Sequence, residues 1–207
     1  MRPNCYIDFD GTIVSNKKRL YQFFLDHIPE QFKNCLTEDE FWLLKRMRIN
    51  EIDWLNNVFK AEIDRNRYDA QKVKEIESEI YLQLDYLIDP SEEALKKIKE
   101  QYNVVLVSRR TNADALRKEI DRLGVSKYLK NIIIGPHDNT AKSEYIRRME
   151  HVHDEDILIG DTEDDIVSGK ELGITTYFVK SGIRSEWIVK KFQYPKIKIV
   201  DSIVNVL

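Results

Sequence analysis

Two acidic side chains stand at the end of the first apolar run of the sequence, in the stretch CYIDFDGTIV at residues 5–14. Asp8 directly follows Cys5-Tyr6-Ile7, and Asp10 comes two residues later. Because a carboxylate is costly to desolvate, acids at the end of a buried strand indicate chemistry. One of them could accept a phosphoryl group as a nucleophile, and the other could exchange protons with the leaving oxygen and with water.

Polar side chains follow three later apolar runs in the same way: Ser108 and Arg109 after residues 104–107, Lys142 beyond residues 132–134, and Asp161 and Asp165 after residues 157–159. In an open parallel sheet, the carboxyl ends of the strands lie along one edge, where ligands bind. We therefore expect these groups to converge. Clustered carboxylates need a cation, and their hard oxygens suit Mg²⁺. The hydroxyl and the ammonium would then bind the remaining oxygens of a phosphate.

The elements that must position these residues form an α/β pattern. Six short apolar runs predict strands: residues 5–7, 104–107, 132–134, 157–159, 174–179 and 197–200. The first four are uniformly apolar, which indicates strands buried on both faces, as in a parallel sheet. From residue 90 onward these runs alternate with helical patterns. We expect a capping box with a helical proline at residues 89–92, opening a helix over 92–101. Three later helices are expected, with ends at Gly124 and Gly173 for two of them.

Residues 15–88 predict an inserted, all-helical domain, with no convincing strand and few glycines or prolines. A capping box is expected at residues 37–40. Apolar residues recur at helical spacing along two faces: Ile52, Leu55, Phe59 and Ile63 on one, and Val73, Ile76, Ile80, Leu84 and Leu87 on the other. The basic runs at 17–19 and 45–48 are expected to mark exposed helix faces. The α/β core would comprise residues 1–14 and 89–207.

The composition is typical of a soluble globular protein, with 42% hydrophobic and 33% charged residues among 207. The net charge is −3, whereas nucleic-acid-binding proteins usually carry an excess of basic residues, so no nucleic-acid partner is expected. The two cysteines are too few for a disulfide framework or a zinc cage. No apolar run approaches the ~20 residues of a membrane helix, and the first strand begins too early for a signal peptide. We expect a cytoplasmic protein with no membrane association, as a monomer or a homodimer.

These motifs resemble those of the haloacid dehalogenase (HAD) superfamily. DFDGT at 8–12, Ser108 after a strand, Lys142 at a helix start and GDTEDD at 160–165 appear in the order of the family's four motifs. The resemblance covers the whole chain. It implies a Rossmann-like HAD core with a helical cap domain, as in phosphoglycolate-phosphatase-like members.

The resemblance also implies roles for individual residues. Asp8 would be the phosphoryl-accepting nucleophile and a Mg²⁺ ligand. Asp10 would be the general acid/base and would bind the metal through its backbone carbonyl. Lys142 and Ser108 would hold the transferring phosphoryl group, and Asp161 would be a further metal ligand.

Three assignments at the site rest on less specific signals. Asp165 would support the metal site, Thr12 would steady the loop or a phosphate oxygen, and Arg109 would contact the substrate. The chain departs from the common family pattern in having Arg109-Arg110 after Ser108, and Ser143 after Lys142. These departures bear on the identity of the substrate and remove no catalytic group.

Plainer structural interpretations exist for the same residues. Asp8 and Asp10 could form a turn at a strand end, and Asp161 and Asp165 could be acids favoured at a helix N-terminus. Ser108 could cap the following helix. The arginines after it could pair with surface acids.

The sequence therefore predicts a Mg²⁺-dependent phosphatase that hydrolyses a small phosphate monoester of a metabolite through an aspartyl-phosphate on Asp8. The helical cap would close over the sheet edge and select the substrate. Two alternatives stay open: a phosphotransferase or phosphomutase that uses the same intermediate, and a non-catalytic module that binds a phosphorylated ligand. Carbon–halogen cleavage is disfavoured, because the resemblance implies that such relatives lack the second acid and the metal.

Overall fold

The structure, a computed structural model, describes residues 2–135 and 140–207. It divides into two compact units, one formed by Met1–Ser15 with Leu87–Leu207 and the other by Asn16–Tyr86. The sequence-based boundaries of the insert were residues 15 and 88. None of the helices within the described ranges combines the length and the apolar character needed to cross a bilayer.

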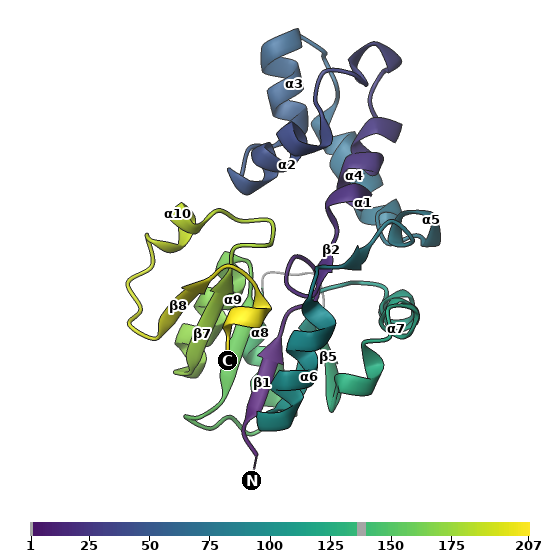
Figure 1. The fold of residues 1–207 in the computed structure, drawn as a ribbon. Helices are drawn as coiled ribbons and strands as arrows, with labels where there is room; N and C mark the ends of the chain where they lie inside the picture. Colours follow the sequence, from purple (N-terminus) through teal and green to yellow (C-terminus); the bar gives the residue numbers. More distant parts are fainter. Residues whose placement is uncertain (1, 136–139) are drawn as a thin grey trace. The chain divides into compact units, whose positions relative to one another are not determined.

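The first unit is built on a parallel sheet of six strands (Figure 1). Its spatial order is β5-β4-β1-β6-β7-β8, and each adjacent pair is parallel. The strands are β1 (Asn4–Ile7), β4 (Asn103–Ser108), β5 (Asn131–Ile134), β6 (Ile157–Gly160), β7 (Thr175–Val179) and β8 (Ile197–Val200). This sheet confirms the predicted Rossmann-like α/β fold class.

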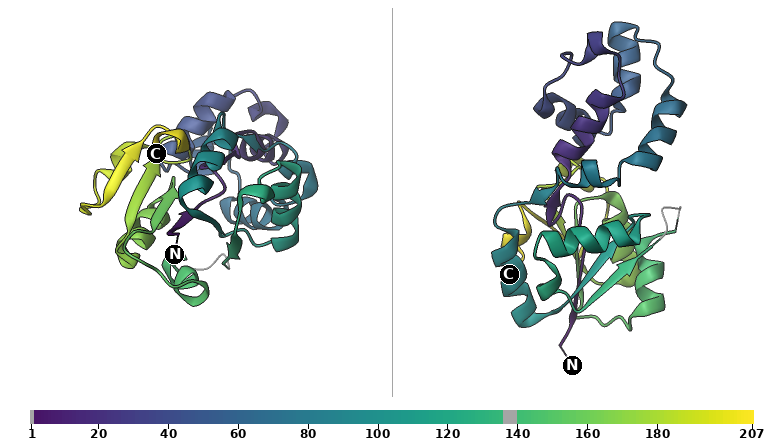
Figure 2. Two further views of the ribbon diagram at one scale, coloured as in Figure 1. Left: turned by 60° about the horizontal axis from the view of Figure 1, so that its bottom comes forward. Right: turned by 90° about the vertical axis from the view of Figure 1, so that its right-hand side faces the viewer.

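Helices cover both faces of the sheet (Figure 1, Figure 2). They are α6 (Ser91–Gln101), α7 (Ala113–Arg122), α8 (Lys142–Met149), α9 (Glu163–Leu172) and α10 (Glu186–Val189), with 3₁₀ turns at Ser126–Tyr128 and Ile203–Asn205. Successive side chains of β1 point to opposite faces of the sheet, and both faces are covered, so every residue of the run at 5–7 is apolar. Cys5 and Ile7 belong to one hydrophobic cluster with side chains of α6 and α7, whereas Tyr6 belongs to another with Tyr145 and Ile146 of α8.

The register of the sheet aligns the ends of its central strands. Ile7 of β1 lies opposite both Leu106 of β4 and Ile159 of β6. Asp8 comes one residue after Ile7, and Ser108 and Asp161 come two residues after its partners, so the three residues lie within one residue of the same level. The backbone N–H of Asp8 donates to the carbonyl of Ile159 at 2.9 Å, which ties the first acid to β6.

The predicted capping box at residues 89–92 is wrong. Helix α6 begins at Ser91, and Pro90 occupies its N-cap position without a side-chain hydrogen bond. Proline offers no side-chain oxygen there, so the reciprocal bonds of a capping box cannot form. The capping box at residues 37–40 is confirmed: Thr37 Oγ1 accepts from the N–H of Glu40, and the carboxylate of Glu40 accepts from the N–H of Thr37.

The second unit is mainly helical, with α1 (Lys17–Asp26), α2 (Glu38–Arg46), α3 (Glu51–Phe59), α4 (Arg65–Glu75), α5 (Glu79–Leu82) and a 3₁₀ turn at Glu30–Phe32. Its interior is aromatic: Phe23 contacts the rings of Tyr68 and Tyr81, and Phe24 contacts that of Phe41. Two short strands, β2 (Val14–Ser15) and β3 (Tyr86–Leu87), pair in a separate sheet. The sequence analysis predicted no strand within residues 15–88.

Both predicted apolar faces of the insert are partly wrong. Ile63 lies beyond the end of α3, where the side-chain amide of Asn56 binds the backbone N–H and carbonyl of Ile63, each at 2.8 Å. The second pattern is broken between α4 and α5, and Val73 and Ile80 are 71% and 74% exposed. The exposed Val73 lies on α4 and the exposed Ile80 on α5, so the pattern does not form one buried face.

The two basic runs are not simply exposed helix faces. Arg19 is buried, with its Nε 3.3 Å from Oδ2 of the buried Asp85. Lys45 pairs with Glu51, a buried carboxylate that also accepts a hydrogen bond from the hydroxyl of Tyr68 at 3.1 Å. Burial of these cations depends on acidic partners distant in the sequence, which a local charge pattern does not reveal.

Candidate active site

The centre of the site is an ammonium between two carboxylates. Lys142, the first residue of α8, places its Nζ 2.9 Å from Oδ1 of Asp8 and 2.7 Å from Oδ1 of Asp165. All three side chains are almost completely buried. Burial opposes the charge of Lys142, but the carboxylates of Asp165 and Asp8 raise its pKa, so the amine stays protonated.

The electrostatics of Asp8 differ from those of an ordinary surface acid. Burial raises the pKa of Asp8 to about 7, while the ammonium of Lys142 acts in the opposite direction and the charge of Asp165 adds to the rise. Positive charge brought close to Asp8 would favour its ionised, nucleophilic form.

Asp161 is the third buried carboxylate of the cluster. Its Oδ2 accepts the backbone N–H of Ile183 at 2.6 Å, whereas its Oδ1 is buried and has no hydrogen-bond partner among the described residues. Burial, with the charges of Asp8 and Asp165, raises the pKa of Asp161 well above its ordinary value. A buried carboxylate oxygen without a hydrogen bond lowers the stability of the fold unless a positive group lies next to it.

The three acids fit a divalent cation. One carboxylate oxygen from each of Asp8, Asp161 and Asp165 lies within 4.8 Å of the others. Hard oxygen ligands of this kind are the donors that Mg²⁺ takes in proteins. A cation bound to Oδ1 of Asp161 would give this buried oxygen the partner that it lacks.

Two glycines are required by the close approach of backbone to Asp161. A Cβ at Gly11 would lie 2.3 Å from Oδ2 of Asp161, and one at Gly182 would lie 2.0 Å from the same atom. Gly11 also has a φ of +76°, which favours glycine. Both loops therefore press against the carboxylate and restrict its orientation.

Sequence analysis missed the loop that carries Gly182. The hydroxyl of Ser181 donates to the carbonyl of Gly11 at 3.2 Å, Ile183 binds Asp161, and Arg184 pairs with Glu163 at 3.1 Å. This loop follows β7, so the same rule that brought together the ends of the first four runs would have identified it.

Asp165 has both oxygens engaged. Its Oδ1 accepts from Lys142, and its Oδ2 accepts from the backbone N–H and the hydroxyl of Thr162 at 3.0 and 2.6 Å. The side chain is thus fixed at the start of α9 and holds the ammonium of Lys142 in turn.

Two hydroxyl groups are buried near the strand ends. Ser108 closes β4, and its Oγ accepts the backbone N–H of Arg110 at 3.2 Å. Thr12 Oγ1 is buried with no hydrogen-bond partner in the described parts of the chain. The helix-cap interpretation of Ser108 is wrong, because α7 is capped by Asn112, whose side chain accepts from the N–H of Ala115 at 3.0 Å.

The consecutive arginines bind different acids. Arg109 Nη1 donates to Oδ2 of Asp164 at 3.2 Å. Arg110 binds Asp10 with two nitrogens, Nε to Oδ2 at 2.7 Å and Nη2 to Oδ1 at 2.8 Å. Both arginines thus pair with acids of the site's own loops, and the substrate contact expected for Arg109 stays a prediction.

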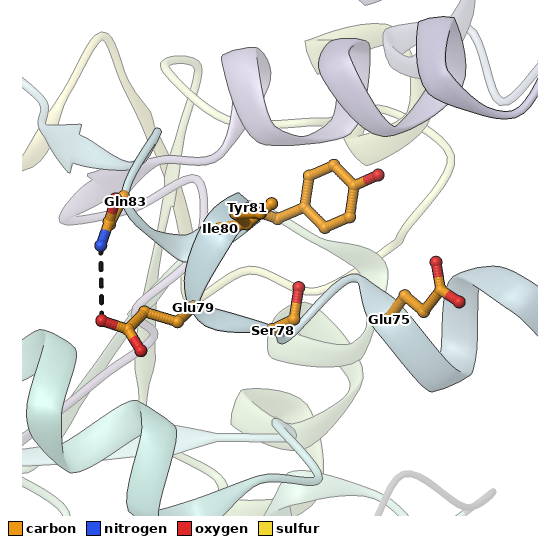
Figure 3. A pocket seen from close by; sticks show the side chains of 6 residues that line it. All are labelled: Glu75, Ser78, Glu79, Ile80, Tyr81 and Gln83. Carbon is orange, nitrogen blue, oxygen red and sulfur yellow. Dashed lines mark hydrogen bonds between the residues drawn. The ribbon is translucent and has the colours of Figure 1, made fainter.

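A surface pocket in the helical unit is a poor alternative site for a phosphate. Figure 3 shows its lining by Glu75, Ser78, Glu79, Ile80, Tyr81 and Gln83. Two of these residues are carboxylates and none carries a positive charge, so a phosphate would be repelled there. Glu79 accepts a hydrogen bond from Gln83 at 3.4 Å across the α5 turn.

The family model described as haloacid dehalogenase-like hydrolase matches residues 6–179. The chain belongs to this family. The match spans residues 8–12, Ser108, Lys142 and the acidic loop after β6, which confirms the resemblance identified from those residues. The enzyme class predicted from the sequence, a HAD-superfamily phosphatase, agrees with this membership.

Solved HAD structures share the fold over almost the entire chain. A predicted phosphoglycolate phosphatase from Haemophilus somnus has a TM-score of 0.71 at 15% identity, with 99% of this chain and 96% of that one covered. A predicted phosphatase from Clostridium acetobutylicum gives 0.64 at 15%, covering 96% and 94%. A predicted β-phosphoglucomutase from Thermotoga maritima gives 0.66 at 18%, covering 99% and 97%. A comparison with curated proteins finds no match.

Proposed function

We propose that this HAD hydrolase is a Mg²⁺-dependent phosphatase that hydrolyses a small phosphorylated metabolite through an aspartyl-phosphate on Asp8. The observation that carries the proposal is the contact of Lys142 with Asp8, at 2.9 Å, beside the buried acids Asp161 and Asp165. A nucleophilic carboxylate, a fixed cation and a set of hard oxygen ligands are the groups that phosphoryl transfer through an acyl phosphate requires.

Asp8 performs the first displacement. Its carboxylate oxygen attacks phosphorus, the bond from phosphorus to the ester oxygen breaks, and the phosphoryl group passes to Asp8. Lys142, fixed by Asp165, offsets the negative charge that gathers on the phosphoryl oxygens as this happens. The hydroxyls of Ser108 and Thr12 are available to donate to the same oxygens.

Asp10 exchanges the protons of both steps. It gives a proton to the leaving alkoxide oxygen during the first displacement. It then takes a proton from the water that attacks the aspartyl-phosphate, and cleavage of the acyl phosphate returns the Asp8 carboxylate and inorganic phosphate. The net reaction consumes one water and releases the alcohol and phosphate.

Asp8, Asp161 and the backbone carbonyl of Asp10 would hold Mg²⁺, with Asp165 supporting the site. When bound, the ion supplies positive charge to the nucleophile and to the phosphoryl oxygens. The buried Oδ1 of Asp161 and the cluster of three carboxylates support this assignment.

The activity assay uses the purified full chain, an aryl phosphate and Mg²⁺. We expect phosphate release that stops when the cation is chelated and returns when Mg²⁺ is added in excess. Asp8→Asn should abolish turnover. Asp114→Asn makes the same chemical change on an exposed acid of α7 and should leave turnover unchanged. Wild-type turnover in Asp8→Asn would refute the nucleophile assignment.

Acceptor sugars separate hydrolysis from phosphoryl transfer. A phosphatase releases inorganic phosphate at the same rate whether or not a sugar is present. A phosphotransferase or mutase would form a sugar phosphate in place of free phosphate. A chain that binds phosphate esters without either product would be a binding module.

A further inference from the structure

The general acid/base residue is held by a cation that the family motifs do not explain. Arg110 meets Asp10 with two parallel N–H donors at 2.7 and 2.8 Å, one for each carboxylate oxygen. Such a paired contact fixes the plane of a carboxylate as well as its position. Asp10 alone would have more freedom, because its side chain is 25% exposed.

The guanidinium of Arg110 is itself fixed on its other side. Its Nη1 donates to Oε2 of Glu119 at 2.6 Å, and the Glu119 side chain is 2% exposed. The guanidinium carbon also lies 5.5 Å from the centre of the Phe9 ring, and the backbone N–H of Arg110 is bound to Ser108. Arg110 therefore cannot follow Asp10 if that carboxylate turns.

A packing role alone leaves part of this arrangement unexplained. The pair of Arg110 with Glu119 would already satisfy a buried charge in this unit. Arg110 also binds the partly exposed carboxylate of Asp10 with two nitrogens. This contact restrains Asp10, and proton exchange depends on the orientation of that carboxylate. Errors of about 1 Å in such groups can cost on the order of 100-fold in rate.

We propose that Arg110, anchored by Glu119, is a positioning residue that fixes the Asp10 carboxylate for proton exchange. The inference rests on the proposed function, since it assigns a partner to the acid/base of that reaction. Arg110 acts through Asp10 and needs no contact with the substrate. Its loss should therefore lower kcat much more than it changes KM.

A double-mutant cycle tests the proposal on the full chain with an aryl phosphate and Mg²⁺. Arg110→Met should lower kcat by about 10- to 100-fold and change KM by less than about twofold. In the background of Asp10→Asn, the same substitution should change the residual kcat by less than about threefold, because the residue that it positions is already lost.

Two further variants separate positioning from charge and from folding. Arg110→Lys keeps a positive charge but lacks the planar fork, so kcat should stay within about threefold of that of Arg110→Met. Arg117→Met removes an exposed arginine from the same helix as Glu119 and should leave kcat unchanged. Circular dichroism and urea unfolding establish that each variant is folded under the assay conditions.

The outcomes distinguish this inference from the proposed function. An active chain in which the effects of Arg110→Met and Asp10→Asn multiply independently would overturn the positioning role alone. Full activity in Arg110→Lys would reduce Arg110 to a source of charge and would also overturn it. A chain that releases no phosphate from any ester would overturn the proposed function, and the positioning role with it.

Discussion

The ammonium of Lys142 lies 2.9 Å from the carboxylate of Asp8, although Lys142 begins helix α8 and Asp8 follows strand β1. The same nitrogen lies 2.7 Å from Asp165. A buried cation shared by two acids neutralises only part of their charge, and Asp161 adds a third carboxylate. The cluster therefore has an excess of negative charge that an additional cation would neutralise.

Removal of the ammonium should be costly for both stability and activity. Lys142→Met leaves Asp8 and Asp165 buried without their cation, so the free energy of unfolding should fall by roughly 3 kcal/mol. Turnover should fall by about 100-fold or more, because charge on the phosphoryl oxygens is no longer offset. Urea unfolding and steady-state kinetics measure the two effects.

Lys97→Met is the control for that substitution. Lys97 is exposed on α6 and pairs with Glu93 at 2.8 Å, so its removal should change the unfolding free energy by less than about 0.5 kcal/mol. Equal stability of the Lys142 and Lys97 variants would contradict the buried charge cluster.

The effect of Mg²⁺ on stability should depend on pH. Burial raises the pKa of Asp8 from 3.8 to about 7 in the cation-free protein, so unfolding releases a proton between these values. The contribution of Asp8 to stability is therefore present at low pH and is lost as pH rises toward about 7. Mg²⁺ binds the ionised carboxylates and should compensate for this loss.

Thermal unfolding with and without Mg²⁺ checks this prediction. The increase in Tm on adding Mg²⁺ should be several degrees at about pH 7.5 and much smaller at about pH 5. Asp161→Asn should weaken the effect at the higher pH. An equal increase at both pH values would show that the ion does not bind these acids.

Space next to Asp161 should control cation affinity. In Gly182→Ala the new Cβ would lie 2.0 Å from Oδ2 of Asp161, so the carboxylate must move. We expect Mg²⁺ affinity, measured by calorimetry, to fall by about 10-fold or more. Gly135→Ala introduces a comparable clash with the Tyr145 ring and should cost stability without this loss of affinity. Unchanged affinity in Gly182→Ala would argue against Asp161 as a ligand.

The framework of the site could be predicted because it follows from topology. Uniformly apolar runs indicated strands buried on both faces, and parallel strands end at one edge. This topology brought Asp8, Ser108 and Asp161 within one residue of the same level. The position of Lys142 at a helix start followed from the order of motifs. These inferences needed no knowledge of side-chain conformation.

Contacts between side chains from distant segments could not be predicted in this way. The sequence singled out Arg110 but gave no sign that it binds Asp10 or that Glu119 anchors it. In the helical unit, Asn56 ended one apolar pattern by binding the backbone of Ile63. Each outcome depends on how a side chain meets a partner in three dimensions, which periodicity does not encode.

The most direct test of the central claim is to trap the phosphorylated chain. Rapid acid quenching during turnover of an aryl phosphate with Mg²⁺, followed by proteolysis and mass spectrometry, should find one phosphoryl group on the peptide that contains Asp8. Asp8→Asn should give no labelled peptide. Rapid phosphate release with no label on Asp8, or with the label on another residue, would contradict the account.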